Sequence, residues 1–222
     1  MEFRLVYSGR VLGASRNDTR ASLKHEIRRE FHPQLRRLWQ VNESLRRLTK
    51  FTGVHHYDAN NPRSIEQENL GSPPDVDKAE DFYLDLGADV ITKRWERCGY
   101  KFWPLVTEEY CVNCSLDILF LRPEERGMII RSGDIDARIK TIFDALRMPK
   151  NLDEAGGSGP QIDEQPFFCL LEDDKLISEI KVTTDSLLLL PRERELKAND
   201  ALLVIHVKLW PTKKNQWDWA FF

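Results

Sequence analysis

The sequence predicts an α/β protein of the α+β arrangement, in which a single mixed β-sheet is flanked by helices. The expected elements follow in the order strand, helix, strands, helix, strands, and no internal repeat interrupts them. The composition also fits a globular chain, because 41% of the 222 residues are hydrophobic and 31% are charged. We therefore expect one domain over residues 1–222.

The first 50 residues predict a strand and then a long basic helix. Apolar and polar residues alternate over residues 2–7, as in a half-buried strand. Apolar residues then recur at helical spacing from Leu23 to Leu48, with a kink or restart expected at Pro33. Residues 1–50 hold 12 Lys and Arg against 5 Asp and Glu, while the whole chain carries a net charge of -3. The charge balance excludes a uniformly basic domain and leaves a basic segment at the N-terminus.

Two polar segments and an aromatic tail surround the expected core. Residues 55–78 and 150–166 are rich in Asp, Gly and Pro and predict inserted loops, and a short helix is expected over residues 79–98. The tail, residues 211–222, carries Trp217, Trp219 and Phe221. We expect it to pack on the protein's own sheet, with burial in a dimer or stacking on unpaired bases as alternatives.

Residues 100–210 predict the core of the domain. The apolar spacing from Ile135 to Leu146 predicts a helix that begins near Asp134 to Asp136 and ends before Pro149. Strands are expected at residues 101–106, 112–120, 167–171, 176–184 and 201–210. A tight acidic turn, Glu172-Asp173-Asp174, joins the third and fourth of these strands.

The first candidate site is the segment from Gly133 to Lys140. Asp134 and Asp136 stand one residue apart at a strand-to-helix junction, where two carboxylates can converge on a hard cation such as Mg²⁺. Lys140 lies one helical turn further on, where an ammonium group could neutralise charge developing on a phosphoryl group. Acidic residues also cap helix starts, and Asp and Lys pair on helix surfaces at this spacing. Both interpretations stay open.

The second candidate site is the acidic turn. Three adjacent carboxylates between apolar strands repel one another, and a divalent ion would relieve that repulsion. A solvated hairpin turn is the alternative, because Asp suits the backbone of turns. Taken together, the two segments supply the parts of a metal site for phosphodiester hydrolysis.

The string GDIDARIKTIFDALR, followed by LLEDDKLISEIKV, resembles the RusA-like Holliday junction resolvases. The family pattern is D-x-D-N-x-x-K, then D-A-L, then a D-D turn with an apolar strand behind it. The resemblance covers about residues 112–183. The matching positions are Asp134, Asp136 and Lys140 in the first motif, Asp144 in D-A-L, and Asp173 and Asp174 in the turn.

The resemblance implies a homodimeric, Mg²⁺-dependent endodeoxyribonuclease that cuts branched or structured DNA in DNA repair and recombination, with Mn²⁺ as a substitute ion. Asp134, Asp136 and Asp174 would be metal ligands, with Asp173 as a helper and Lys140 assisting the water or the transition state. It also implies a bacterial or phage origin. The basic N-terminal helix would face DNA. The arginines expected at the DNA are Arg28, Arg29, Arg36, Arg37 and Arg138.

Position 137 departs from the family pattern, because Ala137 stands where the family has Asn. The insert before Glu172 is also longer than in the family. These departures favour an alternative, a non-catalytic DNA-binding or partner-binding subunit that keeps the fold. A third interpretation is a glycosyltransferase, in which a DxD motif binds a metal and a nucleotide sugar. The absence of a recognisable nucleotide-sugar domain argues against it.

The remaining features indicate a cytoplasmic chain with no membrane partner. No uncharged apolar run approaches the roughly 20 residues that cross a bilayer, and Arg4 interrupts the early apolar run, unlike in a signal peptide. Four cysteines in 222 residues do not predict a disulfide scaffold. Cys111 and Cys114 form a CxxC motif without a second thiol pair at zinc spacing, so we expect ordinary buried or half-buried thiols.

Overall fold

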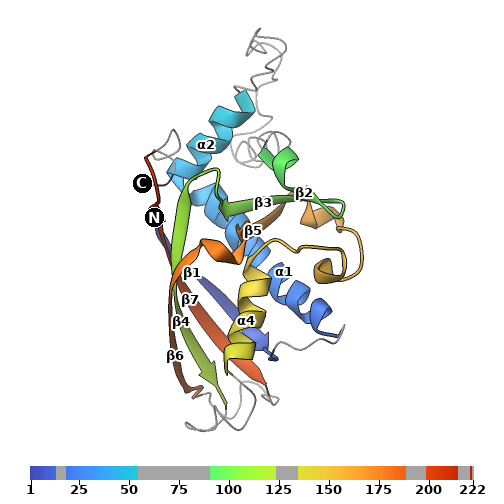
Figure 1. Ribbon diagram of the computed structural model, residues 1–222, viewed down its shortest axis with the longest axis vertical. Coiled ribbons are helices and arrows are strands. Elements are labelled where there is room, and N and C mark those ends of the chain that lie inside the picture. Colours follow the sequence, from blue (N-terminus) through green and yellow to red (C-terminus); the bar gives the residue numbers. More distant parts are fainter. Residues whose placement is uncertain (14–18, 55–90, 124–134, 189–198, 215–220, 222) are drawn as a thin grey trace.

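The protein combines helices with two mixed β-sheets, so the predicted α+β class is confirmed, but the strands divide between two sheets instead of forming one. The structure is a computed structural model (Figure 1). It describes residues 1–13, 19–54, 91–123, 135–188, 199–214 and 221. The predicted loop over 55–78 and most of the short helix predicted over 79–98 lie outside these residues.

The larger sheet has four strands in the order β1-β7-β4-β6. Strand β7 runs antiparallel to both β1 and β4, whereas β4 and β6 are parallel. Figure 1 shows the helices α1 and α4 on one side of this sheet. The strands are β1 (Glu2–Arg10), β4 (Val112–Arg122), β6 (Ile177–Ser186) and β7 (Asp200–Pro211), which confirms the strands predicted near residues 2–7, 112–120, 176–184 and 201–210.

The smaller sheet has three strands in the order β2-β3-β5. They are β2 (Glu96–Arg97), β3 (Tyr100–Val106) and β5 (Phe167–Leu171). Every residue of β5 is buried, as its unbroken apolar run suggests. Strands β5 and β6 do not pair with each other, because β5 pairs with β3 and β6 pairs with β4. The acidic turn is therefore a crossing between two sheets and not a hairpin.

The N-terminal basic segment forms two helices, and Pro33 does not divide them. Helix α1 (Thr19–Val41) continues through Pro33, which lies on its exposed side. The division comes at Asn42, whose side-chain oxygen accepts a hydrogen bond from the backbone N–H of Leu45 at 3.1 Å. This bond is an N-cap for α2 (Glu43–Val54). The predicted kink at Pro33 is thus replaced by a break nine residues later in the chain.

Helix α4 and four short 3-10 turns complete the described fold. Helix α4 (Ile135–Leu146) matches the predicted helix closely. The segment predicted as a loop over 150–166 contains two of the 3-10 turns and packs against α1. The turns are η3 (Thr92–Trp95), η4 (Asp153–Ala155), η5 (Ile162–Glu164) and η6 (Asp174–Leu176).

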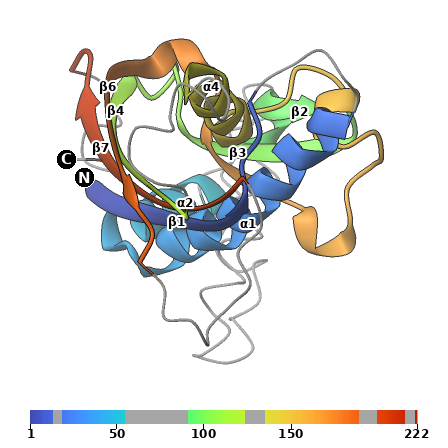
Figure 2. The same cartoon turned by 90° about the horizontal axis from the view of Figure 1, so that it is seen from below.

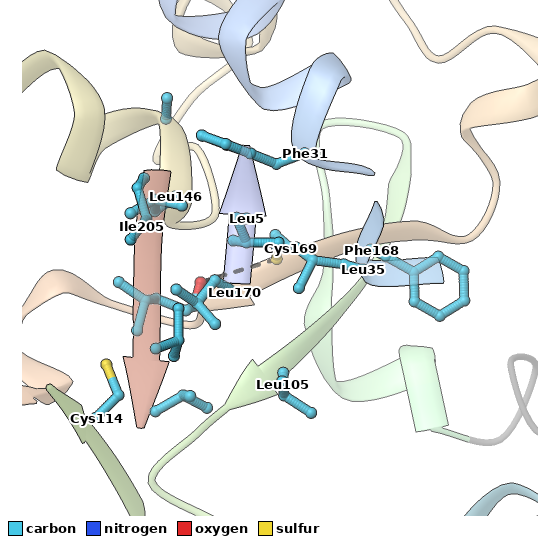
Figure 3. Close-up of a cluster of buried hydrophobic side chains, with 14 of the residues drawn as sticks. Leu5, Phe31, Leu35, Leu105, Cys114, Leu146, Phe168, Cys169, Leu170 and Ile205 are labelled. Carbon is cyan, nitrogen blue, oxygen red and sulfur yellow. Dashed lines mark hydrogen bonds between the residues drawn. The ribbon is translucent and has the colours of Figure 1, made fainter. Parts of the chain in front are cut away.

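The core fills the space between the two sheets, α1 and α4 (Figure 3). Phe31 and Leu35 of α1 face Leu5 of β1, and Phe168 of β5 belongs to the same core. Residues from all the layers are fully buried, so the two sheets share one continuous core.

The free cysteines lie as expected, whereas only one residue at the end of the aromatic tail is described. Phe221 is buried, its ring centroid lies 5.3 Å from that of Tyr110, and its carbonyl oxygen lies 3.3 Å from the N-terminal nitrogen. The other tail aromatics, Trp217 and Trp219, lie outside the described residues. Cys114 is buried and Cys111 half-buried, both as free thiols. Among the described helices, none is long and apolar enough to cross a membrane.

Candidate active site

Asp136 and Lys140 lie on the solvent-exposed side of α4, one turn apart near the start of the helix. Asp134, the other half of the predicted pair, lies outside the described residues. The middle of α4 is held against the segment that follows β1, because the Thr141 hydroxyl donates a hydrogen bond to the carbonyl oxygen of Leu12 at 2.8 Å. The carboxylate of Asp136 and the ammonium group of Lys140 therefore project from a helix that is held in place.

Ala137 packs closely against Gly13. A Cβ atom on Gly13 would lie 3.0 Å from the Cβ of Ala137, tighter than ordinary van der Waals contact. A residue with no side chain at position 13 therefore lets the first turn of α4 approach the chain after β1. The small residue at position 137, which departs from the family pattern, has a packing role in this structure.

The acidic turn lies beside the other end of α4. The Asp173 carboxylate caps η6 by accepting a hydrogen bond from the backbone N–H of Lys175 at 3.1 Å. Burial disfavours the charged carboxylate, but this bond and the neighbouring groups outweigh burial and lower the pKa of Asp173. An Asp174 oxygen lies 4.0 Å from Nε of Arg147, the residue that follows α4. Asp174 remains half-exposed.

The structure therefore separates Asp136 from the acidic turn. Asp136 lies in the first turn of α4 and Arg147 just beyond its last residue, which corresponds to about 16 Å along the helix axis. Oxygen ligands of one octahedral Mg²⁺ lie about 3 Å apart when adjacent and about 4 Å apart when opposite. Within the described part of the chain, no three His, Cys, Asp or Glu side chains are close enough to hold a metal ion. Asp136 therefore cannot share one ion with Asp173 and Asp174 in this structure.

Asp144, the acid of the D-A-L motif, points into the protein and belongs to a buried ionic cluster. It accepts from Lys24 at 2.7 Å and from Arg147 at 2.9 Å, and Arg147 also reaches Glu154 at 3.0 Å. Burial disfavours ionised Asp144, but the hydrogen bond and charge of Lys24, aided by Arg147, outweigh it and lower the pKa of Asp144. This acid therefore ties α1 to α4, and its contacts are structural.

Arg28 lies beneath this cluster and is 1% exposed. Its guanidinium donates to the carbonyl oxygens of Asp144 at 2.8 Å, Glu154 at 3.0 Å and Arg147 at 3.2 Å. Two of these carbonyls lie at the C-terminal end of α4, where backbone acceptors lack helical partners and a cation is favourable. Burial lowers the pKa of Arg28 to about 10, which still leaves it charged at neutral pH.

The prediction that Arg28 and Arg138 contact DNA is wrong for this structure. Each is 1% exposed, and Arg138 donates to the side-chain oxygen of Asn199 at 2.7 Å. A phosphate cannot reach either guanidinium without displacing these contacts. Because both arginines bond to groups distant in sequence, their positive charge serves the interior and adds nothing to a basic surface.

The other three predicted arginines, Arg29, Arg36 and Arg37, remain accessible on α1. Arg29 and Arg36 line a hollow of about 420 Å³ between α1 and η5. Acidic groups share this hollow, and Arg29 already pairs with Glu164 at 2.7 Å. The full lining is Glu26, Arg29, Glu30, His32, Pro33, Arg36, Asp163 and Glu164. The surface is therefore mixed in charge and not uniformly basic.

Two buried histidines hold α1 to the smaller sheet and its neighbouring turn. The Nδ1 atom of His32 accepts a hydrogen bond from the Phe168 N–H at 2.9 Å, and Nε2 lies 3.2 Å from the Asp163 carbonyl. Burial lowers the pKa of His32, and burial with the Arg28 charge lowers the pKa of His25 to about 4. Both rings are therefore neutral at pH 7, with roles in packing.

The residues that sequence reasoning missed are those of the buried cluster, Lys24, Arg147 and Glu154. One signal was available, since Lys24 and Arg28 each come one residue after a core position of α1 and so flank its buried side. Their acceptors lie more than a hundred residues further along the chain and could not be inferred from α1 alone.

No family model, curated protein or solved structure matches this chain.

Proposed function

We propose that the protein is a Mg²⁺-dependent endodeoxyribonuclease acting on branched or structured DNA. The observation that carries the proposal is the joint exposure of Asp136 and Lys140 on one face at the start of α4, in the spacing that resembles the RusA-like motif. A carboxylate and an ammonium group at this separation suit a phosphodiester, since one can bind a cation and the other a phosphate oxygen.

The proposed roles follow from this placement. Asp134 and Asp136 are the proposed ligands of Mg²⁺, for which Mn²⁺ would substitute, and the ion would supply an activated water. The Lys140 ammonium would contact a phosphate oxygen. Asp173 and Asp174 lie at the far end of α4 and are assigned no role at the same ion.

The proposed DNA contacts use the accessible arginines of α1, with Arg36 and Arg37 making phosphate contacts alongside Arg29. A DNA substrate fits the cytoplasmic location that the sequence predicts. Paired nicks in a branched substrate would require two active centres, which fits the homodimer implied by the resemblance.

A cleavage assay tests the proposal. Four-way junctions, flaps and duplex DNA are incubated with the protein in Mg²⁺ or Mn²⁺, alongside Asp136→Asn and the matched control Asp153→Asn, an exposed acid in η4. We expect cleavage by wild type and the control, and a loss of at least about 100-fold for Asp136→Asn. If wild type cuts none of these substrates, or if Asp136→Asn cuts as fast as the control, the proposal fails.

A second candidate is a DNA-binding or partner-binding protein without turnover. The separation of Asp136 from the acidic turn favours it, and so does the packing of Ala137 against Gly13. Calorimetric titration with Mn²⁺ and a DNA-binding assay discriminate the two. DNA binding without Mn²⁺ uptake or cleavage would establish the second candidate, whereas Mn²⁺ uptake that Asp136→Asn abolishes would favour the nuclease.

A further inference from the structure

The two edge strands of the four-stranded sheet are β1 and β6, and a side chain bonds to the outer backbone groups of β1. At the β1 edge, the side chain of Gln34 from α1 bonds to the backbone of Val6: its oxygen accepts from the Val6 N–H at 2.9 Å, and its nitrogen donates to the Val6 carbonyl at 2.7 Å. The amide group thus occupies the place of a neighbouring strand. Strand β6 forms the opposite edge (Figure 2), and within the described ranges no strand pairs with its outer side.

Strand β6 is also exposed on both faces. Ile180 and Val182, on the face shared with the buried side chains of β4, are 49% and 36% exposed. Glu179 and Lys181 lie on the other face and are also exposed. A ten-residue edge strand with exposed apolar side chains is a template for pairing with another strand.

The charges of β6 complement themselves in one register. If two copies of β6 run antiparallel with Ile180 opposite Ile180, then Glu179 of each copy lies opposite Lys181 of the other. Directly opposite residues share a face of the sheet, so both contacts join unlike charges. Centring the pair on Glu179 or on Lys181 would instead place a like charge opposite itself.

Lys181 pairs within its own chain with Asp117 of the inner strand β4 at 2.9 Å, and in the dimer Glu179 of the other copy would supply a second carboxylate on the same face. On the opposite face, the exposed Ile180 side chains of the two copies would cover each other. The register centred on Ile180 therefore brings the two Ile180 side chains together on one face and forms both Glu179–Lys181 ion pairs on the other.

We propose that the protein self-associates through β6, with a second copy of the chain pairing antiparallel along this edge and centred on Ile180. The pairing would join the two four-stranded sheets into one and would satisfy the backbone groups along both free edges. The inference uses only the sheet edge and its side chains, so it stands or falls separately from the proposed nuclease activity.

Charge-reversal variants of the full chain test the register. Glu179→Lys places lysine opposite lysine twice in each dimer, and Lys181→Glu places glutamate opposite glutamate. An equimolar mixture of the two variants restores both attractive pairs, but only between unlike chains. Lys208→Glu, on the same face but on the interior strand β7, is the control. Circular dichroism checks that each variant is folded.

Sedimentation velocity over a concentration series gives the readout. We expect dimers for wild type and for Lys208→Glu, a dissociation constant raised at least about tenfold for each β6 variant, and recovered dimers in the mixture. A wild-type chain that is monomeric at the highest soluble concentration would overturn the proposal. So would β6 variants that dimerise as tightly as the control, or a mixture that shows no recovery.

Discussion

Arg28 provides the sharpest test of how α1 and α4 are held together. Replacing it by methionine keeps most of the side-chain volume but removes donors to three carbonyl oxygens, those of Asp144, Arg147 and Glu154. These oxygens are buried beside a residue that is 1% exposed, so water cannot take its place without opening the contact between the helices.

The expected loss is large. Leaving a buried acceptor unpaired costs about 1–3 kcal/mol, and part of the loss is offset because a charge is no longer buried. For three acceptors we expect Arg28→Met to lower the free energy of unfolding by about 3–5 kcal/mol, a substantial part of the about 5–15 kcal/mol available to a typical domain. Arg28→Lys keeps the charge but lacks the planar fork, so its loss should fall between those of wild type and Arg28→Met.

Urea unfolding followed by tryptophan fluorescence measures these values. Arg37→Met is the matched control, because Arg37 lies on the same helix but is exposed, and its side chain donates to that of Gln40. The control should change the unfolding free energy by less than about 0.5 kcal/mol. If Arg28→Met costs less than about 1 kcal/mol, or no more than the control, the reasoning about the helix ends is refuted.

For two other perturbations the structure fixes the direction of the change in stability. The pKa of His25 is about 4 in the folded protein, below its ordinary value of 6.5, so the unfolded chain binds more protons between these two pH values. The free energy of unfolding should therefore fall as the pH drops from about 6.5 towards 4, and urea titrations at several pH values should show that His25→Phe loses part of this pH dependence. Gly156→Ala should lower the free energy of unfolding by about 1–2 kcal/mol more than Gly157→Ala in the same assay. Both glycines have positive φ, but only at Gly156 would a new Cβ lie 2.9 Å from the His25 ring. Equal losses would contradict that steric argument.

Local periodicity predicted most of the elements but could not assign strands to sheets. Strand β4 alternates buried and half-buried residues along its whole length, and α4 has its apolar residues on one side, so both were predictable. The five apolar residues of β5 indicate a strand buried on both faces and contain nothing that selects its neighbour. Pairing with β3, about 65 residues earlier in the chain, depends on how the layers pack.

The candidate site shows the corresponding limit for function. The motif correctly placed Asp136 and Lys140 on one exposed helix face, because spacing along a helix fixes direction. The motif also includes Asp144, which lies about two turns after Asp136. Because two turns take slightly fewer than eight residues, the Asp144 side chain points in a different direction from that of Asp136 and contacts Lys24. Spacing sets the angle between residues but does not reveal which partner lies at that angle.

The buried cluster bears on the proposed function through the position of α4. Arg28 and Arg147 fix the C-terminal end of the helix, and the contact with Gly13 fixes its first turn. A helix held at both ends presents Asp136 and Lys140 in one orientation, and such rigidity is what a site that binds a phosphodiester requires. The cluster is therefore a positioning element, and any effect of Arg28 variants on cleavage should follow their effect on folding, whereas Asp136→Asn should lower cleavage far more than its small effect on the free energy of unfolding explains.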